Sequence, residues 1–167
     1  KMKETTEKIL DNKNAILSLD PSCSYKDELE FAANMKKAVA NVKALKLPNQ
    51  VKIGGKTINY TGTINKVIFS GMGGSAIAGD LARDWLDTKT RDPMESIRGY
   101  HLPAYADDKT LTFLTSYSGN TEETLSCMYD ALKKSCINIS VSSDGALTRV
   151  NKALGLPVIG LPKMAAA

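Results

Sequence analysis

Two glycine- and serine-rich turns, each set between an apolar strand and a helix, constrain this sequence more than any other feature. The first turn covers residues 70–76 and reads SGMGGSA, and the second covers residues 116–121 and reads SYSGNT. In open parallel sheets, ligands bind beyond the carboxyl ends of the strands, where such turns lie. Because the two turns belong to consecutive strand–helix units, the sequence predicts that both face one ligand at the same edge of a sheet.

Strands and helices alternate from residue 65 onward. Strands are predicted near residues 66–70, 94–98, 110–115, 137–142 and 157–162, and helices over 76–86, about 120–136 and 144–154. Strands that alternate with helices at this spacing indicate right-handed βαβ units and a parallel sheet that is covered on both faces. The predicted fold class is therefore α/β, with a three-layer α/β/α, doubly wound, five-stranded parallel sheet.

The first 64 residues show a different pattern. They contain, in order, a predicted helix over residues 3–17, a second over 26–45 and a small β-hairpin over 51–61. Pro48 ends the second helix, and Gly54–Gly55 lie at the centre of the hairpin. We therefore divide the chain into an N-terminal helical extension with a hairpin, residues 1–64, and a sheet domain, residues 65–167.

In the helices of the sheet domain, the spacing of apolar residues predicts which side chains share one face of a helix. Capping residues predict where the helices begin. One apolar stripe consists of Ile77, Leu81 and Trp85, and the next of Leu125, Met128, Tyr129, Leu132 and Cys136. Asn120 is predicted to cap the second of these helices, with Glu123 completing a capping box. Asp144 is predicted to cap the third helix, which Gly155 ends.

Composition and charge narrow the choice of partners and compartment. The cysteines, Cys23, Cys127 and Cys136, are odd in number and lack metal-ligand spacing, so we expect free thiols in the cytoplasm. A net charge of +4 is spread along the chain without a dense basic run, so no nucleic acid partner is expected. No segment is long and apolar enough to suggest a membrane span.

The residue types of the two turns suit a phosphate group. Glycines let a backbone approach a ligand closely, amides at a helix start carry partial positive charge, and hydroxyls donate to phosphate oxygens. Neither turn contains Lys or Arg, which favours a monophosphate over a triphosphate with a metal ion. The candidate substrate-binding residues are Gly73, Gly74, Ser75, Ser116, Ser118 and Thr121.

A dinucleotide-binding domain is an alternative interpretation. Gly71, Gly73 and Ala76 fit the relaxed dinucleotide fingerprint, and Glu95 stands at about the spacing of a ribose-binding acid. This interpretation leaves the second turn unexplained. Each turn, considered alone, could also be purely structural, because glycines and helix-capping hydroxyls are common between strands and helices.

The segments 71–80 and 116–125 resemble the sugar isomerase (SIS) domain, and more narrowly the bifunctional phosphoglucose/phosphomannose isomerase family, over about residues 65–161. The resemblance implies a flavodoxin-like SIS sheet, and a phosphorylated hexose without a cofactor or a metal ion. It implies that this hexose contacts Gly74, Ser75, Ser116, Ser118 and Thr121, the last three holding the phosphoryl group. It also implies interconversion of glucose 6-phosphate or mannose 6-phosphate with fructose 6-phosphate. Family members have two SIS domains per chain and form dimers, so a homodimer or a partner SIS domain is expected.

The resemblance does not supply a catalytic group within this sequence. In the family, the base and the ring-opening groups come from beyond the first SIS domain, and no catalytic residue is assigned here. His101 is expected to be a loop residue, and Glu122 and Glu123 to be helix-start residues. We expect the chain by itself to bind but not to isomerise a sugar phosphate. A stand-alone SIS-domain sensor or regulator without catalysis is the alternative function.

Overall fold

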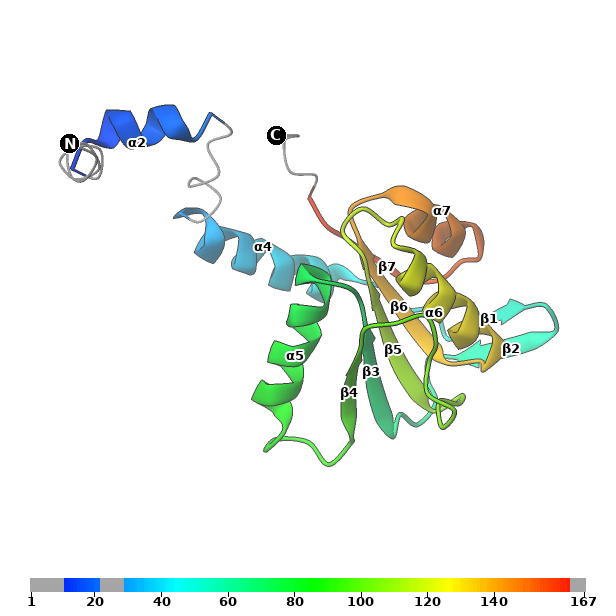
Figure 1. The fold of residues 1–167 in the computed structure, drawn as a ribbon. Coiled ribbons are helices and arrows are strands. Elements are labelled where there is room, and N and C mark those ends of the chain that lie inside the picture. The colour runs from blue at the N-terminus through cyan, green and yellow to red at the C-terminus, as the bar shows by residue number, and fades with distance from the viewer. Residues whose placement is uncertain (1–10, 22–28, 163–167) are drawn as a thin grey trace. The chain divides into compact units, whose positions relative to one another are not determined.

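The computed structural model describes residues 11–21 and 29–162 of the 167-residue chain (Figure 1). The chain forms two compact units that divide between Ala44 and Leu45. The predictions for residues 1–10 and for Cys23 lie outside the described residues.

The N-terminal unit is helical. Helix α2 spans Lys13–Leu19 and helix α4 spans Phe31–Ala44. The side chain of Asn12 caps α2, since its Oδ1 accepts hydrogen bonds of 3.1 Å from the backbone N–H groups of Asn14 and Ala15. Both helices lie within ranges where the sequence predicts helices, and α2 ends two residues later than predicted. The first parts of the two predicted ranges, residues 3–10 and 26–28, lie outside the described residues.

The predicted hairpin belongs to the second unit. Strands β1 (Gln50–Ile53) and β2 (Lys56–Asn59) pair antiparallel. The turn between them places Gly54 and Gly55 at φ of 56° and 80°, as a tight two-residue turn with positive φ requires. The hydroxyl of the following Tyr60 donates a 2.8 Å bond to the carbonyl of Asn138, and burial raises the pKa of this phenol.

Five parallel strands make the central sheet, which confirms the predicted fold class. They are β3 (Lys66–Ser70), β4 (Met94–Ile97), β5 (Thr110–Thr115), β6 (Ile137–Ser142) and β7 (Val158–Gly160). Their spatial order is β4-β3-β5-β6-β7 (Figure 1). The chain moves from β3 to β4 in one direction, and from β5 to β7 in the other. The order of the strands therefore reverses between β3 and β5.

Helices cover the two faces of the sheet unequally. Helix α5 (Gly74–Leu86) packs on β3 and β4, whereas α6 (Glu122–Lys133) and α7 (Gly145–Ala153) pack on β5, β6 and β7 (Figure 1). Ile68 belongs to the core under α6 and α7, whereas Phe69 lies under α5. Adjacent residues of a strand point to opposite faces, so α5 lies on the face opposite α6 and α7.

The main core lies between the sheet and helices α6 and α7. Its buried members are Ile68, Leu102, Ala106, Leu114, Cys127, Met128, Ala131, Cys136 and Leu147. Cys127 and Cys136 are free thiols, as the sequence predicted for them. Burial raises the pKa of both thiols, that of Cys136 to about 12, so they act as apolar packing groups at neutral pH.

The apolar stripe predicted on α5 lies on the surface of the unit. Ile77, Leu81 and Trp85 are 53%, 65% and 69% exposed. The buried residues of α5 are instead Ala76 and Gly79, because the helix approaches the sheet very closely: a Cβ on Gly79 would lie 2.4 Å from the Cβ of Phe69. Tyr129, a member of the apolar stripe predicted for α6, is 61% exposed, since Cys127, Met128 and Ala131 form the buried side of that helix.

Candidate functional site at the reversal of strand order

The two turns start at the carboxyl ends of neighbouring parallel strands. Ser70, the last residue of β3, is in register with Leu114 near the end of β5. The backbones then approach so closely that a Cβ on Gly71 would lie 3.0 Å from the carbonyl oxygen of Thr115. The point at which strand order reverses is where open α/β sheets bind ligands. The structure thus brings both sequence motifs to the edge where a ligand site is expected.

The first turn presents backbone rather than side chains. Gly73 stands at the start of α5 with φ of 51°, and no side chain caps this helix. The turn closes through bonds from the amides of Ser75 and Ala76 to the carbonyls of Met72 and Gly73, of 3.0 and 3.1 Å. Gly73 and Gly74 are exposed and Ser75 is half-buried. A group at this edge would therefore meet glycine backbone and the positive end of α5.

The second turn presents hydroxyls at two depths. Ser116 is only 1% exposed, and its Oγ shares a 2.8 Å hydrogen bond with Oγ1 of Thr121 and accepts a 3.1 Å bond from the amide of Gly119. Ser118 is exposed, and its Oγ accepts a 3.3 Å bond from the amide of Asn120. Ser118 is consequently the more accessible hydroxyl, while Ser116 braces the turn from within.

The capping arrangement of α6 differs from the prediction. Its N-cap is Thr121, whose side chain makes no capping bond to the helix. The predicted cap, Asn120, instead accepts a 3.0 Å bond from the amide of Ala146 in the first turn of α7. Asp144, predicted to cap α7, stands at the N-cap position without a side-chain capping bond. The reason is tertiary: turn 116–121 lies directly against the start of α7.

Charged side chains lie near the carboxyl ends of the strands. Arg98 follows β4 and forms an ion pair with Asp80 of α5. Hydrogen bonds from Arg98 and then Ser96 hold the pKa of the Asp80 carboxyl below its usual range. The first turn of α6 contains Glu122 and Glu123, and the negative charge of Glu123 chiefly raises the pKa of Tyr100. The guanidinium of Arg98 is thus bound to a carboxylate.

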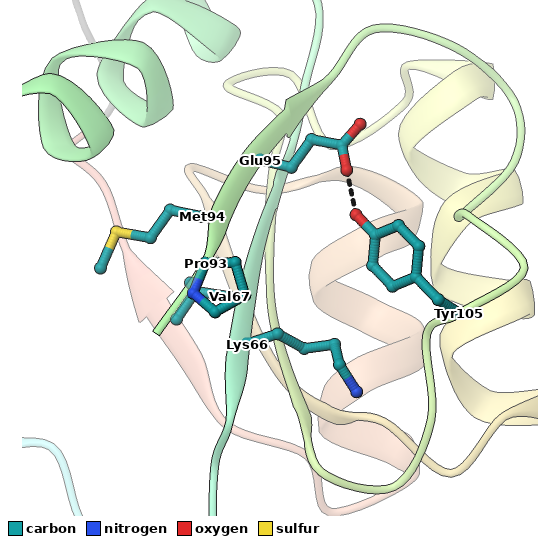
Figure 2. A pocket seen from close by; sticks show the side chains of 6 residues that line it. All are labelled: Lys66, Val67, Pro93, Met94, Glu95 and Tyr105. Carbon is teal, nitrogen blue, oxygen red and sulfur yellow. Dashed lines mark hydrogen bonds between the residues drawn. The ribbon is translucent and has the colours of Figure 1, made fainter. Parts of the chain in front are cut away.

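A cavity of about 560 Å³ lies at the other end of the sheet, where β3 and β4 begin (Figure 2). The hydroxyl of Tyr105 donates to the carboxylate of Glu95 in this cavity, and burial together with Glu95 raises the pKa of the phenol to about 12. Lys66, also on its wall, is paired with Asp107 at 2.9 Å. A carboxylate on the wall disfavours an anionic ligand, so this cavity is the poorer candidate.

The position of Glu95 also argues against the dinucleotide interpretation. A ribose-binding acid would have to stand at the carboxyl edge, beside the glycine turn. Glu95 is the second residue of β4 and lines the cavity at the opposite end (Figure 2).

Three further features of the described residues, 11–21 and 29–162, bear on the kind of site this chain contains. There, no cluster of three or more His, Cys, Asp and Glu side chains could hold a metal ion. None of the helices in these ranges is long and apolar enough to cross a membrane. His101 lies in an exposed loop, with its Nδ1 3.2 Å from a carboxylate oxygen of Asp130.

Several curated proteins similar in sequence to this chain share one description. The chain is 42% identical over 122 residues to the bifunctional phosphoglucose/phosphomannose isomerase of Caldicellulosiruptor bescii, an alignment covering 70% of this chain and 36% of that protein. Over this part of its length, the chain is homologous to the bifunctional phosphoglucose/phosphomannose isomerases. It spans about a third of the length of these relatives. No family model matches the sequence.

One further relative and one solved structure are also similar to this chain. The D-glucosamine-6-phosphate 4-epimerase of Sulfolobus acidocaldarius is 33% identical over 102 residues, covering 60% of this chain and 32% of that protein. A crystal structure of a candidate phosphosugar isomerase from Bacillus subtilis superposes with a TM-score of 0.56 at 22% identity, covering 64% of this chain and 34% of that one. The latter similarity supports the SIS-like fold.

Proposed function

We propose that this chain is the phosphosugar-binding SIS domain of an aldose–ketose isomerase that interconverts glucose 6-phosphate or mannose 6-phosphate with fructose 6-phosphate. The observation that carries the proposal is the meeting of the turns 70–76 and 116–121 at the reversal of strand order. Homology to bifunctional phosphoglucose/phosphomannose isomerases supports the isomerase reaction. The related 4-epimerase supports the wider inference that the ligand is a phosphorylated hexose.

In this proposal the phosphate is held by uncharged donors. Ser118 and Thr121 donate from the second turn, and Ser116 orients Thr121 through their shared hydrogen bond. The glycine backbone at Gly73–Gly74, with Ser75, contacts the ligand from the first turn. The amino ends of α5 and α6 add the partial positive charge of two helix dipoles, each worth roughly 0.3–1 kcal/mol to an anion.

Isomerisation needs a base that moves a proton between C1 and C2, and a group that opens the sugar ring. Within residues 65–162, Glu122 and Glu123 are the carboxylates next to the second turn in sequence, and both belong to the first turn of α6. We assign neither as the base. We propose that the base and the ring-opening groups come from a second SIS domain or from a partner chain, in a cytoplasmic homodimer.

A calorimetric titration tests the proposed ligand class. Fructose 6-phosphate should bind the 167-residue chain, whereas fructose without the phosphate should show no measurable heat at the same concentrations. Equal affinity for the two sugars, or binding of neither, would contradict the proposal. Binding in the complete protein without any turnover would favour a sensor over an enzyme.

A pair of variants tests the second turn. Ser118→Ala with Thr121→Ala removes two donors to a charged group, each worth about 1.5–3 kcal/mol, so fructose 6-phosphate should bind at least about 100-fold more weakly. The matched control, Thr57→Ala with Thr88→Ala, removes two exposed hydroxyls outside both turns. It should leave the affinity unchanged. Undiminished affinity in the first variant would remove the second turn from the site.

A further inference from the structure

The second turn and the start of α7 fit into one another through two glycines. Gly119 and Gly145 have φ of 69° and 83°, values that glycine adopts more easily than other residues. A Cβ on Gly119 would lie 1.7 Å from the carbonyl oxygen of Asp144, and a Cβ on Gly145 would lie 2.2 Å from that of Ser118. The two backbones are therefore in direct contact, although 26 residues separate the glycines.

Four hydrogen bonds hold the two segments together. The backbone amide and the hydroxyl of Ser143 both donate to the carbonyl of Tyr117, at 3.1 and 2.6 Å. The amide of Leu147 donates to the carbonyl of Gly119 at 2.8 Å. The amide of Ala146 donates to Oδ1 of Asn120 at 3.0 Å. Two first-turn amides of α7 therefore bind the second turn.

Asn120 connects this anchor to the exposed hydroxyl of the turn. Its side-chain oxygen accepts a hydrogen bond from α7, while its backbone amide donates to Oγ of Ser118 at 3.3 Å. The next residue is Thr121, the other accessible hydroxyl of the turn. If the bond to Ala146 were lost, the peptide between Ser118 and Thr121 would lose a fixed point on a rigid helix.

We propose that Asn120 positions the hydroxyls that bind the phosphate. By accepting a hydrogen bond from the backbone amide of Ala146, its side chain holds Ser118 and Thr121 in the geometry that binds the ligand. This inference rests on the proposed function, because it concerns the same site. It assigns to Asn120 an action through α7 rather than a contact with the sugar phosphate.

A double-mutant cycle on the two partners of this bond tests the inference. Asn120→Ala removes the acceptor. Ala146→Pro removes the donor from the other side of the bond, and proline is tolerated in the first turn of a helix. Each single variant should weaken the binding of fructose 6-phosphate about fivefold. The double variant should be no weaker than either single variant, because both remove the same interaction.

The outcomes separate three roles. A loss in Asn120→Ala but not in Ala146→Pro would mean that Asn120 contacts the ligand, and would overturn the inference. Lower melting temperatures with unchanged affinity would mean a purely structural cap, and would also overturn it. Asn12→Ala removes a comparable cap at α2 and should leave the affinity unchanged.

A readout without ligand keeps this inference separate from the proposed function. The amide of Gly119 is bound to Ser116 within the turn. Its hydrogen exchange should be faster in both Asn120→Ala and Ala146→Pro than in the unmodified chain. Faster exchange without any sugar phosphate binding would refute the proposed function alone, whereas unchanged exchange in both variants would refute the positioning role.

Discussion

Gly119 combines a left-handed backbone conformation with a contact that leaves no room for a side chain. Gly119→Ala should therefore lower the free energy of unfolding by about 3 kcal/mol or more, from strain at positive φ together with the clash on Asp144. Gly155 is the matched control, because it has φ of 71° and open space around its Cα. Gly155→Ala should cost only about 1 kcal/mol. Equal losses in chemical denaturation would contradict the interlocked geometry.

Asp107 should stabilise the folded state slightly at neutral pH, and acid should remove this stabilisation. Hydrogen bonds from Lys66, Thr110 and Lys109 hold the pKa of its carboxyl below the usual value. A lowered folded-state pKa stabilises the fold above the unfolded pKa of about 3.9, and this stabilisation is lost as the pH falls through the folded pKa. The side chain is 46% exposed, so the effect should stay below about 1 kcal/mol.

Melting temperatures measured from pH 2 to pH 6 check this prediction. The difference between the unmodified chain and Asp107→Asn should be largest at pH 6 and should shrink toward pH 2. Asp108→Asn, at the neighbouring exposed carboxylate, serves as the control. A difference that grows as the pH falls would have the wrong sign.

For single residues, the sequence predicts roles that depend only on neighbouring positions in the chain. The turn glycines at 54–55 and the helix-ending Gly155 occur where their conformational freedom indicated. The cap at Asn120 was assigned wrongly, because its partner, Ala146, lies 26 residues away and only the tertiary fold brings the two together. The Ser116–Thr121 bond was likewise not foreseen.

At the scale of elements, burial separates helices that look equally amphipathic. Leu147 of α7 is fully buried in the core, so Leu147→Ala should cost about 2–5 kcal/mol in the free energy of unfolding. Leu81 of α5 is 65% exposed, and Leu81→Ala should change that energy by no more than about 0.5 kcal/mol. Denaturant titration of the two variants checks this. An equally large loss at Leu81 would show that its side chain is covered.

The order and type of the elements followed from periodicity, but the orientation of their side chains did not. The sequence predicted five strands, and all five are present. It did not reveal that the sheet face under α6 and α7 is lined along β5 and β6 by polar residues, all of which are buried: Thr110, Thr112, Asn138, Ser140 and Ser142. On the other face, Leu111 and Phe113 are only half-buried. Periodicity shows which residues share a face, but not which face becomes covered.

At the scale of the whole molecule, the strand order β4-β3-β5-β6-β7 carries the functional argument. The sequence predicted that both turns lie at one edge, since carboxyl ends of parallel strands share an edge. Periodicity alone could not predict that β3 and β5 are neighbours, because the direction of each crossover depends on packing across the sheet. The flavodoxin-like sheet implied by the family resemblance does predict this order, and the structure has it. The neighbouring positions of β3 and β5 bring the turns of two strand–helix segments together at the edge of the sheet where we propose the phosphate site.

The proposed location of the catalytic base outside this chain predicts binding of the sugar phosphate without turnover. The 167-residue chain should bind fructose 6-phosphate but should not convert it to an aldose phosphate, because we assign the base to a second domain or chain. A coupled assay that detects glucose 6-phosphate, run with the chain alone, checks this. Turnover by the purified chain would show that a group such as Glu122 or Glu123 serves as the base.

The most direct measurement is a map of backbone amide shifts on adding fructose 6-phosphate to the ¹⁵N-labelled chain. The proposed site predicts that the largest shifts fall on residues 71–76 and 116–121 together, and that fructose alone produces none. Shifts confined to one turn, or centred on Lys66, Glu95 and Tyr105 at the opposite end of the sheet, would contradict it.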